Sequence, residues 1–200
     1  MLYNQLNLDV AKIASTSDIK PEFASVYFTS TKTVATDSSR LLEMSTPNDA
    51  DPADFLTVGD AGALLTLPEG VDSFMVNAKK LATIKLPKKM SLSVLNNVAI
   101  REVGKNSVEF ITNDLESMDT KSIRLTDGNF PNYEQVFPTG KPLAELTLNA
   151  ELLEGLLEVM GKLNKLHQVT IKVYEAHKPM VLEASNDNQR ARGLLMPMKN

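Results

Sequence analysis

The chain has 200 residues, of which 42% are hydrophobic and 23% are charged, and its formal net charge is −4. This composition is typical of a folded globular protein and not of a disordered chain. The chain contains no cysteine, which excludes disulfides, thiolate nucleophiles and cysteine-ligated zinc. No apolar run approaches the roughly 18 residues of a membrane span, and the start lacks the features of a signal peptide. We therefore expect a cytoplasmic protein without membrane contact.

The first part of the chain predicts a strand, a helix and three further strands. A short β-like segment, "LYNQL", leads into an amphipathic helix predicted at Leu8–Ser15. Strands are then predicted in "ASVYFTS", "KTVATD" and "RLLEMS". The acidic stretch that follows, at about residues 46–63, contains both proline and glycine and is typical of a long loop or insertion.

The same β-α-β-β-β pattern recurs twice more. In the second copy "SFMV" leads into a helix at Asn77–Lys85, followed by strands in "SLSVL", "VAIREV", "SVEFIT" and "SIRLT". In the third copy "AELTL" leads into a helix at Asn149–Leu166, followed by strands in "QVTIKVYE", "PMVLEAS" and "RGLLMPM". Asn77 and Asn149 are predicted N-caps. The apolar stripe of the last helix comprises Leu152, Leu153, Leu156, Leu157, Met160 and Leu163. The pattern predicts an α+β fold of about three units, with antiparallel sheets and helices on one face.

A proline-rich segment separates the second copy from the third. The stretch "DGNFPNYEQVFPTGKP" contains three prolines, and proline disfavours a helical conformation in the residue before it. We therefore predict an extended linker, with the chain dividing near Phe137 into domains at residues 1–137 and 138–200.

No constellation of catalytic residues is recognisable in the sequence. The two histidines, His167 and His177, do not have the spacing of a metal-binding pair. The serines of "DSSR" lack a glycine elbow, and no glycine-rich phosphate loop occurs. We therefore expect no enzyme activity, no bound metal and no cofactor.

Three stretches, in order along the chain, resemble the bacterial DNA sliding clamp family, the β subunit of DNA polymerase III. The stretch "FASVYFTSTKTVATDSSRLLEMS" resembles the middle domain, where V-A-T-D-G-H-R-L is usual. The stretch "FPNYEQVFP" resembles the connector F-P-D/N-Y-x-x-V-x-P between the middle and last domains. The ending "LLMPMKN" resembles the family's M-P-M-R-L. The resemblance implies the clamp fold built from repeated β-α-β-β-β units.

The resemblance also implies a groove that binds short peptides of polymerases, the clamp loader and repair proteins. In this sequence Ser38 and Ser39 replace the usual Gly-His, and Lys199 replaces an arginine. Two alternatives remain: Met196 and Met198 pack in a core, or the groove is inherited but unused. The implied groove residues are Phe23, Thr36, Ser38, Ser39, Arg40, Leu41, Pro131, Tyr133, Val136, Leu194, Met196, Pro197, Met198 and Lys199.

The family's second property is to encircle duplex DNA without reading its sequence, through basic residues on the helices that line the ring. The lysines that the resemblance assigns to this role are Lys12, Lys79, Lys80, Lys162 and Lys165. Three acidic residues of the last helix oppose such contact: Glu151, Glu154 and Glu158.

The chain is shorter than a usual clamp subunit. It resembles the middle domain followed by the C-terminal half of the last domain, and a lone half-domain would leave a sheet edge exposed. We expect a homo-oligomer: four chains would supply a ring of about twelve units, or two half-domains would pair. A compact monomer is the remaining option. The predicted function is a clamp-like processivity factor; the alternative is a peptide-binding adapter or competitor that does not encircle DNA.

Overall fold

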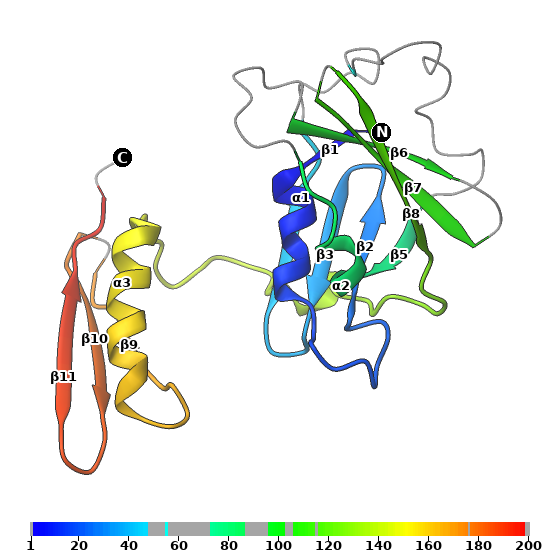
Figure 1. The fold of residues 1–200 in the computed structure, drawn as a ribbon. Coiled ribbons are helices and arrows are strands. Elements are labelled where there is room, and N and C mark those ends of the chain that lie inside the picture. The colour runs from blue at the N-terminus through cyan, green and yellow to red at the C-terminus, as the bar shows by residue number, and fades with distance from the viewer. Residues whose placement is uncertain are drawn as a thin grey trace. The chain divides into compact units, whose positions relative to one another are not determined.

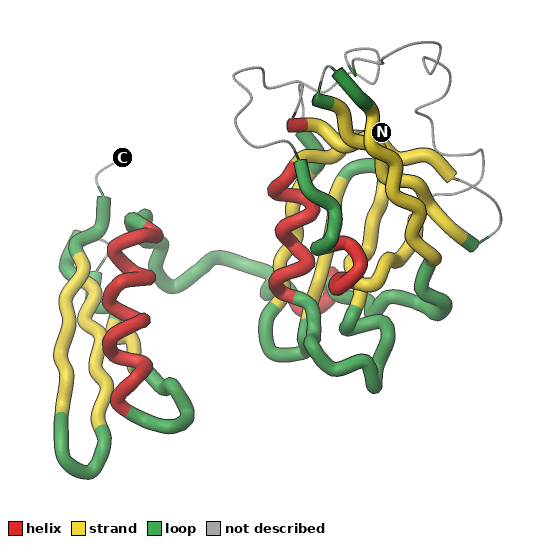
Figure 2. Tube along the Cα trace, in the orientation of Figure 1, coloured by secondary structure: helices red, strands yellow, loops and turns green. Residues whose placement is uncertain are grey.

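The computed structural model describes residues 2–47, 55, 73–86, 96–102, 106–114, 116–175 and 177–198. The chain forms two compact units, Met1–Glu134 and Gln135–Asn200, and each is described by itself. Figure 1 shows the elements of each unit in chain order, and Figure 2 separates helices from strands by colour.

The first unit contains two copies of the repeated pattern. The elements of the first copy are β1 (Leu2–Asn4), α1 (Gln5–Asp9), the 3₁₀ helix η1 (Val10–Ile13), β2 (Ser25–Thr29), β3 (Lys32–Thr36) and β4 (Leu41–Ser45). The elements of the second copy are β5 (Ser73–Asn77), α2 (Ala78–Leu81), β6 (Asn97–Glu102), β7 (Ser107–Asn113) and β8 (Met118–Arg124). The α+β fold with antiparallel sheets is confirmed.

Each copy gives its first strand to the sheet of the other copy. The two four-stranded sheets have the orders β4-β3-β2-β5 and β1-β6-β7-β8. Strand β5 therefore completes the sheet of the first copy, where Ser25 lies opposite Asn77. Strand β1 completes the sheet of the second copy, where Asn4 lies opposite Asn97. All of these pairings are antiparallel.

The hydrophobic core of the first unit is drawn from both sheets and both helices, with Phe28 at its centre. The Phe28 ring stacks on Phe74 at 5.0 Å and meets the edges of Tyr3 at 5.2 Å and Phe110 at 5.8 Å. Phe28 belongs to the first copy, whereas Phe74 and Phe110 belong to the second. Burial of these aromatic rings therefore holds the two copies together.

The first two helices have other bounds than predicted. Helix α1 begins at Gln5 and not at Leu8, since Asn4 and Asn7 form a capping box in which each side chain bonds the other's backbone amide. The helix predicted at Asn77–Lys85 is a single turn, Ala78–Leu81, and Asn77 caps it as predicted.

The second unit contains one copy of the pattern. Its elements are η4 (Glu134–Val136, at the boundary), α3 (Ala150–Met160), η5 (Gly161–Leu163), β9 (Thr170–Lys172), β10 (Met180–Ser185) and β11 (Arg190–Leu195). The strands form one antiparallel sheet in the order β11-β10-β9. Helix α3 lies across one face of this sheet (Figure 2). Asn149 caps α3 through the Leu152 amide, as predicted.

Three predictions for the second unit need correction. The helix predicted at Asn149–Leu166 ends as α3 at Met160 and continues only as the 3₁₀ turn η5. The segment Ala144–Leu148, predicted as a strand, belongs to no sheet. Leu152, assigned to the apolar stripe, is 60% exposed, whereas the rest of that stripe packs against Met180, Leu182 and Leu195.

Some predictions fall outside the described residues. These are the strand in "SLSVL", nearly all of the acidic insertion at 46–63, and Lys199. Within the described part of the chain, no helix is long and apolar enough to cross a membrane.

The buried side chain of Asn7 generates the first testable prediction. Its amide nitrogen donates to the Thr33 hydroxyl and to the carbonyls of Met44 and Ser45, at 3.2, 3.3 and 3.0 Å. Asn7→Ala would remove these three hydrogen bonds and the bond from the Asn4 amide to the Asn7 side chain, so we expect a loss of about 2–3 kcal/mol in unfolding free energy, measured by urea denaturation. The control is Gln5→Ala on the exposed side of the same helix, which should change stability by less than about 0.5 kcal/mol. Equal effects of the two substitutions would contradict this role of Asn7.

Candidate functional site

The hairpin between β3 and β4 brings the predicted residues Thr36, Ser38, Ser39, Arg40 and Leu41 together in one turn. Thr36 lies opposite Leu41, and the Thr36 hydroxyl donates to the Arg40 carbonyl at 2.8 Å. The Asp37 carboxylate accepts from the amides of Ser39 and Arg40 at 2.9 and 3.0 Å, and from the Arg40 Nε at 2.9 Å.

These bonds lower the pKa of Asp37, the Ser39 amide being the largest contribution. The carboxylate therefore stays ionised at neutral pH, and it holds the turn and the Arg40 guanidinium in one conformation.

Ser38 occupies the left-handed region of backbone conformation, with φ of 78°. Only glycine adopts this conformation without steric cost, because a Cβ atom crowds the neighbouring carbonyl. The sliding clamp pattern that this stretch resembles has glycine at this position, which suits a left-handed conformation.

Phe23 lies in the segment before β2 and is half-buried. The Lys20 ammonium lies over the Phe23 ring, 5.4 Å from its centroid. The Phe23 carbonyl accepts a hydrogen bond from the Ser15 amide at 2.7 Å. The Arg40 guanidinium donates to the Lys12 carbonyl at 3.4 Å, so the β3–β4 turn contacts the 3₁₀ helix η1.

The proline-containing connector is anchored to the first unit by three aromatic rings. Phe130 stacks on Tyr27 of β2, with centroids 5.0 Å apart and planes 7° apart. Tyr133 meets the edge of Phe130 at 5.9 Å. The Tyr133 side chain is buried, which raises its pKa. Tyr133, predicted for the groove, therefore anchors the connector and exposes little surface, whereas Pro131 is half-buried.

Lys32 fixes the end of this connector. Its ammonium lies 2.9 Å from the Glu43 carboxylate, 3.2 Å from the Glu134 carboxylate and 5.1 Å from the centroid of the Tyr133 ring. The pKa of Lys32 is raised by its interaction with the Tyr133 side chain and then by the carboxylates. Sequence reasoning missed Lys32 and Tyr27. The sequence held one indication of this role: Tyr27, an aromatic residue with a polar hydroxyl, lies between two apolar residues of a predicted strand.

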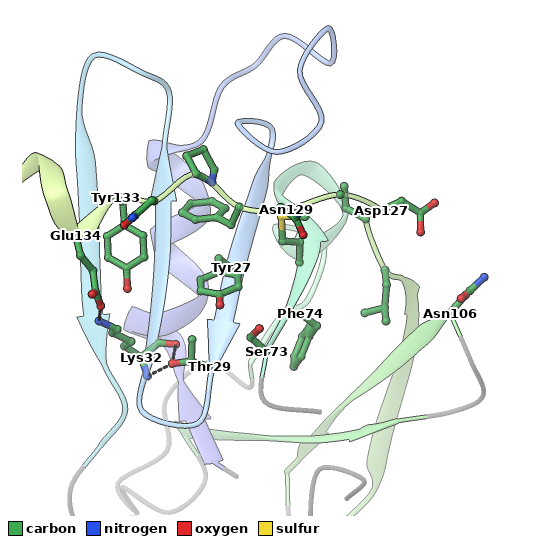
Figure 3. Close-up of a pocket in the computed structure, with 17 residues that line it drawn as sticks. Tyr27, Thr29, Lys32, Ser73, Phe74, Asn106, Asp127, Asn129, Tyr133 and Glu134 are labelled. Atoms are coloured by element: carbon green, nitrogen blue, oxygen red, sulfur yellow. Dashed lines mark hydrogen bonds and ion pairs between the residues drawn. The ribbon is translucent and has the colours of Figure 1, made fainter. Parts of the chain in front are cut away.

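A hollow of about 710 Å³ lies beside this anchor, between the connector and strands β2 and β5 (Figure 3). Figure 3 shows Tyr27, Lys32, Phe74 and Tyr133 among the side chains that line it. Pro131 is the other predicted groove residue at this hollow.

The chain end presents a row of exposed apolar side chains in the second unit. Leu194, Met196 and Met198 are 57%, 57% and 52% exposed, whereas Leu195 between them is 6% exposed. This alternation is that of a strand with one buried face. The Met198 amide donates to the Thr147 carbonyl at 2.8 Å, so the tail is held by its backbone. Val136 is also exposed, and Pro197 is half-buried.

The five lysines predicted to contact DNA are all exposed, but three of them are paired with acids. Lys12 pairs with Asp9 at 2.9 Å, Lys79 with Asp18 at 2.6 Å, and Lys162 with Glu158 at 2.8 Å. Within the described residues, Lys80 and Lys165 make no ion pair. The pairing reduces the positive potential that these lysines offer to phosphates.

Comparison with known proteins identifies the fold. The chain is similar over 100% of its length to the DnaN sliding clamp, DNA polymerase III subunit β, of Pseudomonas aeruginosa bound to griselimycin, with a TM-score of 0.66 and 17% identity. The DNA polymerase III β subunits of Borrelia burgdorferi, in complex with a natural product, and of Thermotoga maritima match with TM-scores of 0.64 and 0.57, at 14% and 16% identity. These alignments cover 98% and 100% of this chain. No protein-family model and no curated protein matches.

The predicted resemblance to the sliding clamps is thus confirmed at the level of the fold. The chain spans about half the length of these clamps, with 50%, 48% and 51% of them covered. The assignment of residues 1–137 to the middle domain and of 138–200 to a half-domain stays a prediction, as do the groove and the DNA contacts.

The conformation of Ser38 generates the second prediction. Ser38→Gly should raise the unfolding free energy by about 0.5–1 kcal/mol, because relief of the left-handed strain exceeds the extra entropy that glycine gains on unfolding. The hydrogen bond from the residue 38 amide to the Thr36 hydroxyl is kept, since it uses the backbone. Thermal and urea unfolding of wild type, Ser38→Gly and the neighbouring control Ser39→Gly would measure this. A stabilisation at position 39 but not at 38 would refute the argument.

Proposed function

We propose that this chain is a sliding clamp-like, non-enzymatic processivity factor that acts in the cytoplasm. In this proposal copies of the chain associate around duplex DNA and recruit a polymerase, a clamp loader or repair proteins through short peptides. The observation that carries the proposal is the clamp fold, which extends over 100% of the chain in the similarity to the Pseudomonas aeruginosa sliding clamp. Association of several copies is part of the proposal.

The peptide-binding part of the proposal is supported by the exposed apolar row Leu194, Met196 and Met198. Short peptides bind through a few apolar anchors, and methionine adapts to different partners because it is unbranched and polarizable. The predicted contacts Thr36, Arg40 and Leu41 lie together in the β3–β4 turn of the first unit. Ser39 offers a small hydroxyl where the family pattern has an imidazole, so the preferred peptides should differ from those of the family.

The DNA-binding part of the proposal depends on sequence-independent attraction between lysines and phosphates. Lys80 and Lys165 would supply most of this attraction, because ion pairs partly neutralise Lys12, Lys79 and Lys162. Binding should therefore be weak and should fall steeply with salt.

These ion pairs favour one alternative function. A clamp-derived adapter or competitor would bind the same peptides without encircling DNA. It would need no basic surface, and the partial neutralisation of the lysines suits it.

The exposed methionines generate the third prediction. Met196→Ala combined with Met198→Ala should weaken binding of a clamp-binding peptide, with a leading glutamine and later leucine and phenylalanine, at least about tenfold. Both substitutions leave the backbone bond from residue 198 to Thr147 in place. The control is Leu166→Ala, which removes another exposed apolar side chain of the second unit. Fluorescence anisotropy measures the affinities. Equal affinity of all three proteins would remove the tail from the peptide site.

Topological trapping on DNA separates the two functions. A ring should stay on closed circular plasmid during gel filtration and leave the same plasmid after linearisation. Retention on the circle alone supports the processivity factor. Peptide binding without retention on either DNA contradicts encirclement and favours the adapter.

A further inference from the structure

In the first unit, each sheet is completed by the first strand of the other copy. Strand β5 of the second copy pairs with β2, and β1 of the first copy pairs with β6. The two exchanges have the same register. In both, the asparagine that caps the following helix lies opposite the first residue of the accepting strand: Asn77 opposite Ser25, and Asn4 opposite Asn97.

The second unit has only one copy, and the accepting strand in it is β9. Like β2 and β6, β9 is the first strand after the helix of its copy. Within the described residues its only neighbour is β10, so its other edge has no partner strand.

Apolar side chains of β9 are more exposed than those at the equivalent positions of β2 and β6. When Thr170 is aligned with Ser25 and Asn97, Ile171 corresponds to Val26 and Val98, and Val173 corresponds to Phe28 and Ile100. The four residues of the first unit are all 0% exposed, whereas Ile171 and Val173 are 49% and 45% exposed. The same two positions are thus fully buried wherever the exchange is present.

The second unit also contains an unused donor strand. Aligning the caps Asn77 and Asn149 places Leu146, Thr147 and Leu148 at the positions of Phe74, Met75 and Val76. One edge of this segment already makes the equivalent bond, because the Thr147 carbonyl accepts from the Met198 amide at 2.8 Å, as the Met75 carbonyl accepts from the Thr126 amide at 2.8 Å. In β5 the opposite edge pairs with β2, whereas no strand in the described part of the second unit pairs with residues 144–148.

We propose that the second units of two chains exchange these strands. The segment Ala144–Leu148 of each chain adds to β9 of the other, and two half-domains form one complete clamp-type domain with two-fold symmetry. A two-fold interface is self-complementary, and this chain supplies both halves of it, the donor segment and the accepting edge. The proposal specifies the self-association of the proposed function, and it depends on neither DNA nor peptide binding.

The register inherited from the first unit brings compatible side chains together. Leu148 lies opposite Ile171, and Leu146 opposite Val173, on the face that α3 covers. Thr147 lies opposite Lys172 on the other face, where Lys172 already pairs with Glu183 at 2.7 Å. No like charges oppose each other in these pairs, and a shift by one residue would turn the leucines away from the helix.

A disulfide at one pair of the register tests the proposal. The chain has no cysteine, so Thr147→Cys with Lys172→Cys introduces the only thiols. These positions correspond to Met75 and Tyr27, which lie opposite each other in β5 and β2. The Met75 carbonyl bonds away from β2, so this is a non-hydrogen-bonded pair, whose Cα atoms are about 4.5 Å apart and suit a disulfide. The control is Thr147→Cys with Val173→Cys, whose side chains would lie on opposite faces.

The full chain is oxidised at micromolar concentration and analysed by non-reducing electrophoresis and by sedimentation. We expect a dimer before oxidation, a cross-linked dimer for the 147–172 variant, and a disulfide between peptides of two chains in mass spectrometry. The 147–173 variant should cross-link at least about tenfold less. A monomer in sedimentation overturns the exchange together with the proposed self-association. A dimer in which both variants cross-link equally, or neither does, overturns the exchange alone.

Discussion

A β-α-β-β-β repeat of this protein cannot complete its own sheet. Among the described residues, in none of the three repeats does the first segment join the sheet of the three strands that follow it, so the fourth position is open to a strand of another repeat. In the first unit this need is met within the chain, through β1 and β5. The Phe28 ring then packs against rings of the other copy, Phe74 and Phe110. The exchanged strand β5 therefore contributes to the shared core, since its Phe74 ring stacks on Phe28.

The candidate site residues of the first unit depend on this framework. The β3–β4 turn extends from the completed sheet, where Asp37 and Thr36 hold its backbone through hydrogen bonds. The connector is fixed on the same sheet by the Phe130 and Tyr133 rings and by the ammonium of Lys32. Residues that are distant in sequence thus acquire defined positions because a sheet of two copies supports them.

Much of this fold could be predicted from local patterns. The alternation of "SVYFT" and "KTVAT" identifies strands, and asparagines before apolar helical segments identify caps at Asn77 and Asn149. The order of the three resembling stretches was enough to indicate the clamp fold. These signals are local, since they depend on residues within one element and its flanks.

The predictions that failed depend on neighbours that the local pattern does not contain. Leu152 fits the helical stripe but is exposed, because the sheet beneath α3 covers only part of that stripe. The segment Ala144–Leu148 has the pattern of a strand but has no sheet to join in its own unit. The role of Lys32 required three partners from β4, the connector and its 3₁₀ turn. No sequence window contains all of them.

The hydrogen bond from the Met198 amide to the Thr147 carbonyl joins two segments to which different roles are assigned. A ligand that orders the apolar tail also restricts the backbone of the donor strand, and a partner that captures the donor strand also restricts the tail. Under the proposed roles of these two segments, peptide occupancy and subunit association would be thermodynamically linked. The factor by which peptide binding changes the association constant of the subunits equals the factor by which subunit association changes the peptide affinity.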